Sequence, residues 1–192
     1  DSFVILTLYV DDMLLVGNSL KIISVVKGLL AKKFEMKDLG PASMILGMQI
    51  KRERHRGRVW LSQRKYIEDV MKKFNKTDFK LVQTPMTKAL KLSKDRCPKT
   101  EEERKEMASV PYASAVGSLM YAMICTRPDI AQVVGVLSRF MSKPGKEHWM
   151  AVKRVFRYLR GTSDLWLCYE GVKDSRGQPP LQLECFVDVD WG

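Results

Sequence analysis

The sequence predicts an α+β fold in which β-hairpins with packed helices are followed by a mostly helical region and two more strand-like segments. Two apolar runs near the N-terminus flank a short polar connection, which is typical of a hairpin of buried strands. Apolar residues then recur at helical spacing over residues 20–34, 63–75 and 111–160. Segments 165–169 and 181–188 again have the character of strands. Helices that bury one apolar face against a sheet give a layered α+β domain.

The first predicted hairpin carries two adjacent carboxylates, Asp11 and Asp12, between its apolar runs. Aspartate tolerates turn geometry and can bond to its own backbone, so the pair is expected at the connection. Carboxylate oxygens at the tip of rigid strands suit a hard divalent cation such as Mg²⁺. A solvated turn that carries two charges is the simpler interpretation of these two residues taken alone. The choice therefore depends on the rest of the chain.

Composition indicates a polyanionic partner. The 192 residues include 33 Lys+Arg and 22 Asp+Glu, which gives a formal net charge of +11. Such a surplus points to nucleic acid or to an anionic membrane surface. No stretch approaches the ~20 apolar residues of a membrane span, and no pattern typical of a signal peptide stands at the start. We therefore expect nucleic acid as the partner and no membrane.

The cysteines show neither zinc nor disulfide spacing. Cys97, Cys125, Cys168 and Cys185 lie far apart without a C-x-x-C pair, and the chain has only two histidines. Wide gaps in a basic chain with a core of its own do not suggest a disulfide framework. We expect reduced thiols of an intracellular protein.

Helices and strands alternate over the first 83 residues. Helices are expected over residues 20–34 and 63–75, each with one apolar stripe. A strand is expected over residues 44–50, and its return strand over 59–61. Gly47 inside the first of these strands suggests a bulge or the close approach of another backbone.

A strongly basic segment, residues 51–58, connects those two strands. Its arginines include Arg54, Arg56 and Arg58. Because arginine and lysine supply most of the salt-dependent affinity of proteins for nucleic acid, this tip is a candidate for phosphate contact. A charged loop that keeps a sheet edge soluble explains the same residues equally well.

Residues 84–108 lack a clear period and are predicted to form a linker or a mobile loop. Beyond them, the helix expected over residues 146–160 has its apolar positions on one side. Four cations line up beside that side at 3.6 residues per turn: Lys146, Lys153, Arg157 and Arg160. With no acid among them, they favour a track for phosphates, and cationic side chains that snorkel at the edge of the core are the alternative.

The last strand-like segment, residues 181–188, alternates apolar and polar positions and ends in acids. Asp188 and Asp190 lie at its far end. Carboxylates at a strand end either hold a metal ion or cap a turn, and the residues alone leave both interpretations open.

An ordered set of motifs resembles the reverse transcriptases of copia-type long-terminal-repeat retrotransposons. Tyr9-Val-Asp-Asp12 between apolar strands looks like their polymerase metal-binding motif. Residues 34–40 and 45–48 look like the stretch that follows this motif in the palm. Residues 188–192 look like the opening strand of the tethered ribonuclease H domain. Six further segments are similar to the family's helical region after the palm: Tyr112, 116–121, 126–130, 136–141, His148-Trp149 and 157–162.

The resemblance implies a domain organisation and a set of partners. Residues 1–83 would be the distal palm, 84–108 the linker or mobile loop, 109–162 a helical region like the thumb or connection, and 163–192 the start of ribonuclease H. The partners would be an RNA template, a DNA primer, their RNA·DNA hybrid, deoxynucleoside triphosphates and the rest of the Pol polyprotein. Cytoplasmic particles or the nucleus would be the location of the parent element.

The resemblance also implies roles at a polymerase centre. Asp11 would ligate the catalytic divalent ions, Mg²⁺ or Mn²⁺, and Asp12 would assist at the same site. Lys37 stands where the family has a lysine near the incoming nucleotide, which makes it a candidate proton donor to pyrophosphate. A solvated helix end is the alternative for Lys37.

The same resemblance implies that other residues contact nucleic acid or belong to a second metal site. Tyr9 and Met13 would shape the surface near the primer terminus. Gly47 and Met48 would belong to the primer grip, where a duplex backbone approaches. Asp188 matches the first acid of ribonuclease H.

The chain also departs from the family pattern. The family's palm uses another acid from an upstream strand, and its fingers and the remaining ribonuclease H acids are not matched here. We therefore expect both active sites to be incomplete and predict that this chain alone has no polymerase or nuclease activity, although its parent would. The alternative is a non-catalytic basic nucleic-acid-binding module derived from such an element, because binding needs only the basic surfaces. A coiled-coil scaffold is disfavoured because heptads are absent.

Overall fold

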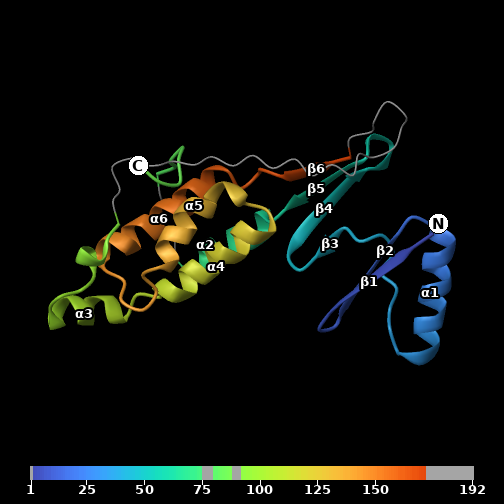
Figure 1. The fold of residues 1–192 in the computed structure, drawn as a ribbon, viewed down its shortest axis with the longest axis horizontal. Coiled ribbons are helices and arrows are strands. Elements are labelled where there is room, and N and C mark those ends of the chain that lie inside the picture. The colour runs from blue at the N-terminus through green and yellow to red at the C-terminus, as the bar shows by residue number, and fades with distance from the viewer. Residues whose placement is uncertain (1, 75–79, 88–91, 172–192) are drawn as a thin grey trace.

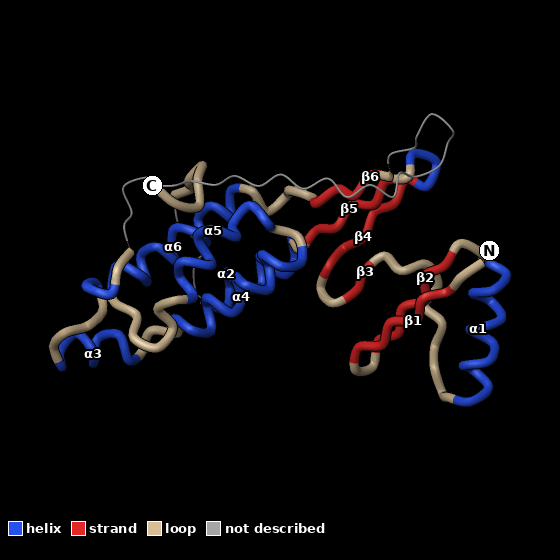
Figure 2. The backbone as a smooth tube through the Cα atoms, in the orientation of Figure 1, coloured by secondary structure: helices blue, strands red, loops and turns tan. Residues whose placement is uncertain are grey.

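The computed structural model describes residues 2–74, 80–87 and 92–171 and combines strands with helices (Figure 1). The helices that follow residue 63 gather at one end of the molecule (Figure 2). A sheet extends from these helices, and the N-terminal hairpin with its helix lies at the opposite end. The mixed α and β content agrees with the predicted class.

The N-terminal unit consists of β1 (Val4–Tyr9), β2 (Asp12–Gly17) and α1 (Leu20–Lys33). The two strands pair antiparallel, and α1 packs against β2. The helix ends at Phe34, where the positive charges of Lys32 and Lys33 lie close to its last carbonyl groups. The predicted hairpin and the predicted first helix are both confirmed.

The prediction that the strands of this hairpin are buried is wrong for this chain. Most of β1 is exposed, and its Leu8 keeps 63% of its surface in contact with solvent. No described residue before Ser62 is buried. Two strands and one helix present too little apolar surface to enclose a core of their own.

The second sheet is antiparallel throughout, with the strand order β3-β4-β5-β6. Its strands are β3 (Met44–Ile45), β4 (Met48–Glu53), β5 (Arg58–Ser62) and β6 (Leu167–Glu170). A short 3-10 helix, η1 (Arg54–Arg56), forms the basic tip between β4 and β5, and Gly57 follows it with a left-handed φ of 63°. The return strand predicted at residues 59–61 is confirmed by β5.

Two strand predictions need correction. A single strand over residues 44–50 is wrong, because the chain reverses at Leu46 and Gly47 and separates β3 from β4. The strand expected at residues 165–169 forms as β6, and its partner is β5 of this sheet rather than the segment 181–188. Residues 181–188 lie outside the described residues.

Five described helices form the part of the chain that has a core. They are α2 (Arg64–Lys73), α3 (Glu101–Ala108), α4 (Tyr112–Cys125), α5 (Ala131–Ser138) and α6 (Lys146–Gly161), with the short turns η2 (Lys94–Arg96) and η3 (Pro128–Ile130) between them. The apolar stripes of α2, α4, α5 and α6 meet in one core, in which Ala115, Val152 and Val155 are fully buried. The Phe74 and Phe156 rings stack with their centroids 5.5 Å apart. The helices predicted over residues 63–75 and 146–160 are confirmed.

The segment predicted as a linker or mobile loop, residues 84–108, contains the helix α3. Its first turn has a capping box, in which the Thr100 hydroxyl accepts a hydrogen bond from the Glu103 N–H and the Glu103 carboxylate accepts one from the Thr100 N–H. Met107 anchors the helix because its side chain is buried. The charge run concealed this helix because it leaves α3 with very few apolar positions.

Among the described residues, no single helix has the length and apolarity that a membrane-spanning segment requires. Only α3 and α4 taken together meet that test of length and composition, and the two are bent by 54° relative to each other.

Candidate functional site

The two predicted acids lie at the tip of the first hairpin. Val10 and Asp11 form the two-residue connection, and Asp12 is the first residue of β2, opposite Tyr9. Both aspartates are exposed. Val10 has a φ of 50°, which β-branched residues avoid, so the tip holds backbone strain of about 1–3 kcal/mol. Strain of this kind clusters at functional sites.

A second tight turn, formed by Leu46 and Gly47, connects β3 to β4. The φ angles of these residues are 48° and 73°, and a two-residue hairpin loop with both angles positive is a type I′ turn. Gly47 tolerates this conformation without a steric penalty, which accounts for glycine at this position. Met48, half-buried, follows as the first residue of β4.

One side chain from the helical core contacts this second turn. The Tyr121 hydroxyl, on α4, donates a hydrogen bond of 2.5 Å to the Leu46 carbonyl oxygen. The Tyr121 ring meets the Tyr66 ring edge to face, with centroids 5.0 Å apart and an interplanar angle of 70°. Tyr66, on α2, donates from its own hydroxyl to the Ser118 carbonyl at 3.1 Å. The turn is therefore attached to a pair of tyrosines that belong to two helices.

The acid-bearing hairpin lies near the same tyrosines. Burial raises the pKa of Tyr121 to about 12, and smaller contributions to this increase come from Cys125, Tyr66 and Tyr9. The contribution from Tyr9 means that its phenol, next to the two acids, lies within electrostatic range of Tyr121.

Lys37 lies in the segment after α1 and is exposed. Its neighbour Asp38 accepts hydrogen bonds from the Lys27 ammonium and from the Gly40 N–H, each at 2.9 Å. These bonds, first that of Lys27, lower the pKa of Asp38. The segment is thereby tied back to α1, and the Lys37 side chain extends into solvent.

No group of three or more His, Cys, Asp or Glu side chains in the described ranges could hold a metal ion. The oxygen donors of Asp11 and Asp12 still suit a hard cation such as Mg²⁺ or Mn²⁺ as part of a larger ligand set. Asp188 lies outside the described residues.

The basic tip is partly engaged within the chain. Arg58 forms an ion pair of 2.6 Å with Glu170 of β6, and its hydrogen bond to that carboxylate raises the pKa of Arg58. Arg56 lies 3.8 Å from Glu53. Arg54 is exposed on η1. Phosphate contact by these arginines stays a prediction.

The four aligned cations of α6 do not form one free stripe. Lys146 pairs with Glu106 at 2.5 Å, and the Arg157 guanidinium donates to the Lys80 carbonyl at 2.6 Å. Lys153 is half-buried, and Arg160, although exposed, also interacts within the chain. Two of the four thus hold other parts of the protein, and the phosphate track stays a prediction.

Comparisons with known proteins identify the chain's family. A family model described as "Reverse transcriptase (RNA-dependent DNA polymerase)" matches residues 1–88. The retrovirus-related Pol polyprotein from transposon TNT 1-94 of Nicotiana tabacum is 61% identical over 171 residues, which are 89% of this chain and 13% of that protein. The chain belongs to the reverse transcriptase family of copia-type Pol polyproteins. The resemblance stated from the sequence is confirmed.

Two further relatives of this reverse transcriptase segment cover nearly all of it. The Pol polyprotein from transposon RE1 of Arabidopsis thaliana is 36% identical over 190 residues, 99% of this chain and 12% of that protein. An uncharacterized mitochondrial protein of the same plant is 34% identical over 186 residues, 97% of this chain and 71% of that protein. The chain therefore spans a small share of the polyproteins that it matches. No solved structure is significantly similar to it.

In this reverse transcriptase segment, the motif at residues 126–130 builds a buried clamp. Arg127, only 2% exposed, binds both carboxylate oxygens of Asp129 at 2.9 and 2.7 Å. It also donates to the Thr162 carbonyl at 3.0 Å and to the Thr162 hydroxyl at 2.6 Å. Tyr158 donates to Asp129 at 2.8 Å. The clamp fixes the end of α6 and hence the path of the chain toward β6.

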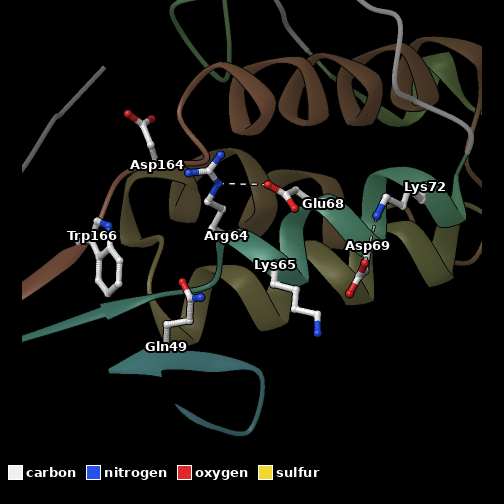
Figure 3. A pocket seen from close by; sticks show the side chains of 8 residues that line it. All are labelled: Gln49, Arg64, Lys65, Glu68, Asp69, Lys72, Asp164 and Trp166. Carbon is white, nitrogen blue, oxygen red and sulfur yellow. Dashed lines mark hydrogen bonds and ion pairs between the residues drawn. The ribbon is translucent and has the colours of Figure 1, made fainter. Parts of the chain in front are cut away.

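A polar groove of about 530 Å³ lies between α2, β4 and the segment that connects α6 to β6 (Figure 3). Along α2 it holds two ion pairs, Arg64 with Glu68 at 3.1 Å and Asp69 with Lys72 at 3.7 Å. Its lining residues are Gln49, Arg64, Lys65, Glu68, Asp69, Lys72, Asp164 and Trp166. The reverse transcriptase motifs did not point to this groove, because its residues come from three distant segments.

Proposed function

We propose that this chain supplies one part of the polymerase centre of an RNA-directed DNA polymerase, within a longer Pol polyprotein. The observation that carries the proposal is the pair of exposed carboxylates, Asp11 and Asp12, at the strained tip of a hairpin. The second tight turn, at Leu46 and Gly47, is attached to Tyr121 of α4, whose phenol lies within electrostatic range of Tyr9 beside the acids. Phosphoryl transfer depends on concentrated charge and accurate positioning, and rigid hairpins are suited to both tasks.

The chain's own residues have distinct roles in this proposal. Asp11 holds a divalent ion, and Asp12 assists it from the neighbouring strand position. Bound Mg²⁺ or Mn²⁺ supplies the Lewis acidity that activates a primer 3′-hydroxyl and neutralises the charge of the leaving pyrophosphate. Lys37 extends into solvent as a candidate proton donor to pyrophosphate.

Residues next to the acids and at the second turn hold the nucleic acid. Tyr9 and Met13 flank the two aspartates on β1 and β2 and line the surface for the primer terminus. Gly47 and Met48 offer a backbone at which the primer strand lies. The partners in the intact polyprotein are then an RNA template, a DNA primer, their hybrid and deoxynucleoside triphosphates. Residues 163–192 are proposed to begin a ribonuclease H domain, with Asp188 as its first acid.

The polymerase proposal is tested by replacing the acids in the intact Pol polyprotein. Asp11→Asn keeps the size of the side chain but removes its charge, and we expect template-dependent synthesis to fall about 100-fold or more. Glu102→Gln, an equal charge change on the exposed face of α3, is the matched control and should leave synthesis unchanged. Full activity of the Asp11→Asn enzyme would refute the assignment.

The isolated chain is predicted to be inactive. A primer-extension assay with Mg²⁺ on this polypeptide should give no template-dependent product, because two carboxylates are fewer ligands than a two-metal centre needs. Measurable extension by the isolated chain would contradict the prediction of an incomplete centre.

A second candidate function, non-catalytic binding of nucleic acid, is favoured by the net charge of +11 and the exposed Arg54 on η1. Affinity for an RNA·DNA hybrid should then fall steeply between about 50 and 200 mM salt, since binding releases counterions. Arg54→Ala should weaken binding and flatten this salt dependence, whereas Asp11→Asn should not weaken it. An affinity that is independent of salt would count against this function.

A further inference from the structure

We infer that Tyr121 is a positioning residue that holds the turn at Leu46 and Gly47 in place against the helical core. Through this turn it sets where a primer strand lies relative to Asp11 and Asp12. The inference rests on the proposed function for its consequence, but its structural part stands on contacts within the chain.

The turn needs a tether because its hairpin is very short. β3 contributes only two residues, which pair as Met44↔Gln49 and Ile45↔Met48. A two-stranded hairpin of this size is marginal by itself, even though β4 continues to β5. The Leu46 carbonyl belongs to the first central residue of the turn, where it lies outside the hairpin's own ladder, and Leu46 is half-buried. The Tyr121 hydroxyl satisfies that carbonyl at 2.5 Å.

The tether is rigid because Tyr121 belongs to a well-packed helix. Its neighbours on α4, Leu119 and Ala122, are 1% and 2% exposed. The edge-to-face contact with Tyr66 restricts the Tyr121 ring, and Tyr66 is itself held by its hydrogen bond to Ser118. The helical core therefore fixes the position of the turn through Tyr121.

The same phenol lies near the acid-bearing tip. Tyr9, the residue opposite Asp12 in β1, is within electrostatic range of Tyr121. A displacement of the Leu46 carbonyl therefore changes the spacing between the two hairpin tips. A misplacement of about 1 Å at a reacting centre can lower the rate on the order of 100-fold. This spacing therefore matters for the proposed reaction.

The test compares two variants that each lose one hydroxyl. Tyr121→Phe removes the bond to Leu46 and keeps the ring, and Tyr66→Phe removes the bond to Ser118 and keeps the ring contact. Amide hydrogen exchange is measured over residues 44–49 of this chain, together with the midpoint of thermal unfolding and the affinity for an RNA·DNA hybrid. Losing one hydrogen bond should accelerate exchange about two- to tenfold at the turn.

We expect Tyr121→Phe to speed exchange over residues 44–49 and to weaken hybrid affinity several-fold, with the unfolding midpoint close to that of the wild type. Tyr66→Phe keeps both the ring contact and the bond to Leu46, so it should speed exchange at the turn far less than Tyr121→Phe does. Equal exchange in Tyr121→Phe and wild type, or equal loosening by both variants, overturns the inference. If the wild-type chain does not bind the hybrid, the proposed function fails, and the exchange comparison still decides whether Tyr121 holds the turn.

Discussion

Gly145, at the start of α6, is a residue at which two backbone segments approach each other closely. A Cβ at this position would lie 1.9 Å from the Arg96 carbonyl oxygen of η2, whereas one at Gly135 on α5 would meet nothing within 4 Å among the described residues. Gly145→Ala must therefore displace backbone, and we expect it to lower the free energy of unfolding by about 1–3 kcal/mol.

Gly135→Ala is the matched control, because it adds the same methyl group to an exposed helix interior. Alanine there should raise the free energy of unfolding by about 0.5–1 kcal/mol. Denaturant titration of the two variants checks both signs, and an unchanged stability of Gly145→Ala would contradict the close approach of η2.

His148 makes the stability of the bundle depend on pH. It is fully buried, stacks on Phe140 with ring centroids 4.0 Å apart, and accepts a hydrogen bond at Nδ1 from the Gly145 N–H at 2.9 Å. Burial lowers the pKa of His148, and this effect outweighs the opposing influence of the Ser93 carbonyl and Glu147. The folded protein therefore favours the neutral ring.

The unfolded chain consequently binds a proton at a higher pH than the folded chain does. His148 thus contributes stability that is fully present above the unfolded pKa of about 6.5 and that is lost as pH falls through this value toward the folded pKa. His148→Gln keeps an acceptor for Gly145 without a titrating ring, so it should flatten the pH dependence of the unfolding midpoint between about pH 7 and pH 5. A profile as steep as that of the wild type would assign the pH dependence to other groups.

Single residues also mark where prediction from sequence stops. The sequence predicts the carboxylates of Asp11 and Asp12 at the tip, because charged residues between two apolar strands fall in the connecting turn. The same pattern did not indicate that Val10 would take a positive φ, since β-branched residues rarely do. Tyr121 was identified only as part of a motif, because its partner Leu46 is 75 positions away.

At the scale of elements, the Arg127 clamp connects η3 to the end of α6. Burial alone would raise the pKa of Asp129, but hydrogen bonds from Arg127 and Tyr158 outweigh it and lower that pKa. Lysine would place one ammonium where the guanidinium makes four hydrogen bonds, so Arg127→Lys should destabilise the protein by about 1–3 kcal/mol.

The location of that loss distinguishes the clamp from general packing. Arg127→Lys should speed hydrogen exchange in α6 near Thr162 and in β6 more than in α4. Arg139→Lys, an equivalent change at the exposed end of α5, should leave stability within about 0.5 kcal/mol of the wild type. Uniformly faster exchange in the Arg127 variant would argue against a local clamp.

Elements with a regular apolar stripe were predicted well, and elements defined by local polar chemistry were not. α2 and α6 bury one face each, so their periodicity was visible in the sequence. α3 depends on its capping box of Thr100 and Glu103, a signal that was present in the sequence but was outweighed by the charge run. No residue of β6 is buried, and nothing in residues 165–169 indicates that its partner is β5.

At the scale of the whole molecule, stability is concentrated in the helical bundle. The described residues before Ser62 contain no buried side chain, whereas Leu119 in the bundle is 1% exposed. Leu119→Ala should lower the free energy of unfolding by about 2–5 kcal/mol, because it leaves a cavity in the core. Leu8→Ala, at a position that is 63% exposed, should change it by no more than about 0.5 kcal/mol.

Denaturant unfolding followed by far-ultraviolet circular dichroism measures both changes. Similar losses for the two leucines would mean that the N-terminal unit shares the cooperative core of the bundle. Charge in the sequence was a poor guide to free surfaces of the molecule. Lys146 and Arg157, aligned on α6, bind Glu106 and the Lys80 carbonyl within the chain.

The pairing of β6 with β5 has a consequence for the order of events during synthesis. Arg58 and Glu170 face each other across these strands although they are 112 positions apart. On a translating ribosome, β4 and β5 emerge early and must wait until every helix of the bundle has followed before β6 can join them. Contacts of such long sequence separation form slowly. Nascent chains halted before residue 167 should therefore contain a collapsed helical core beside a sheet whose outer edge is still open.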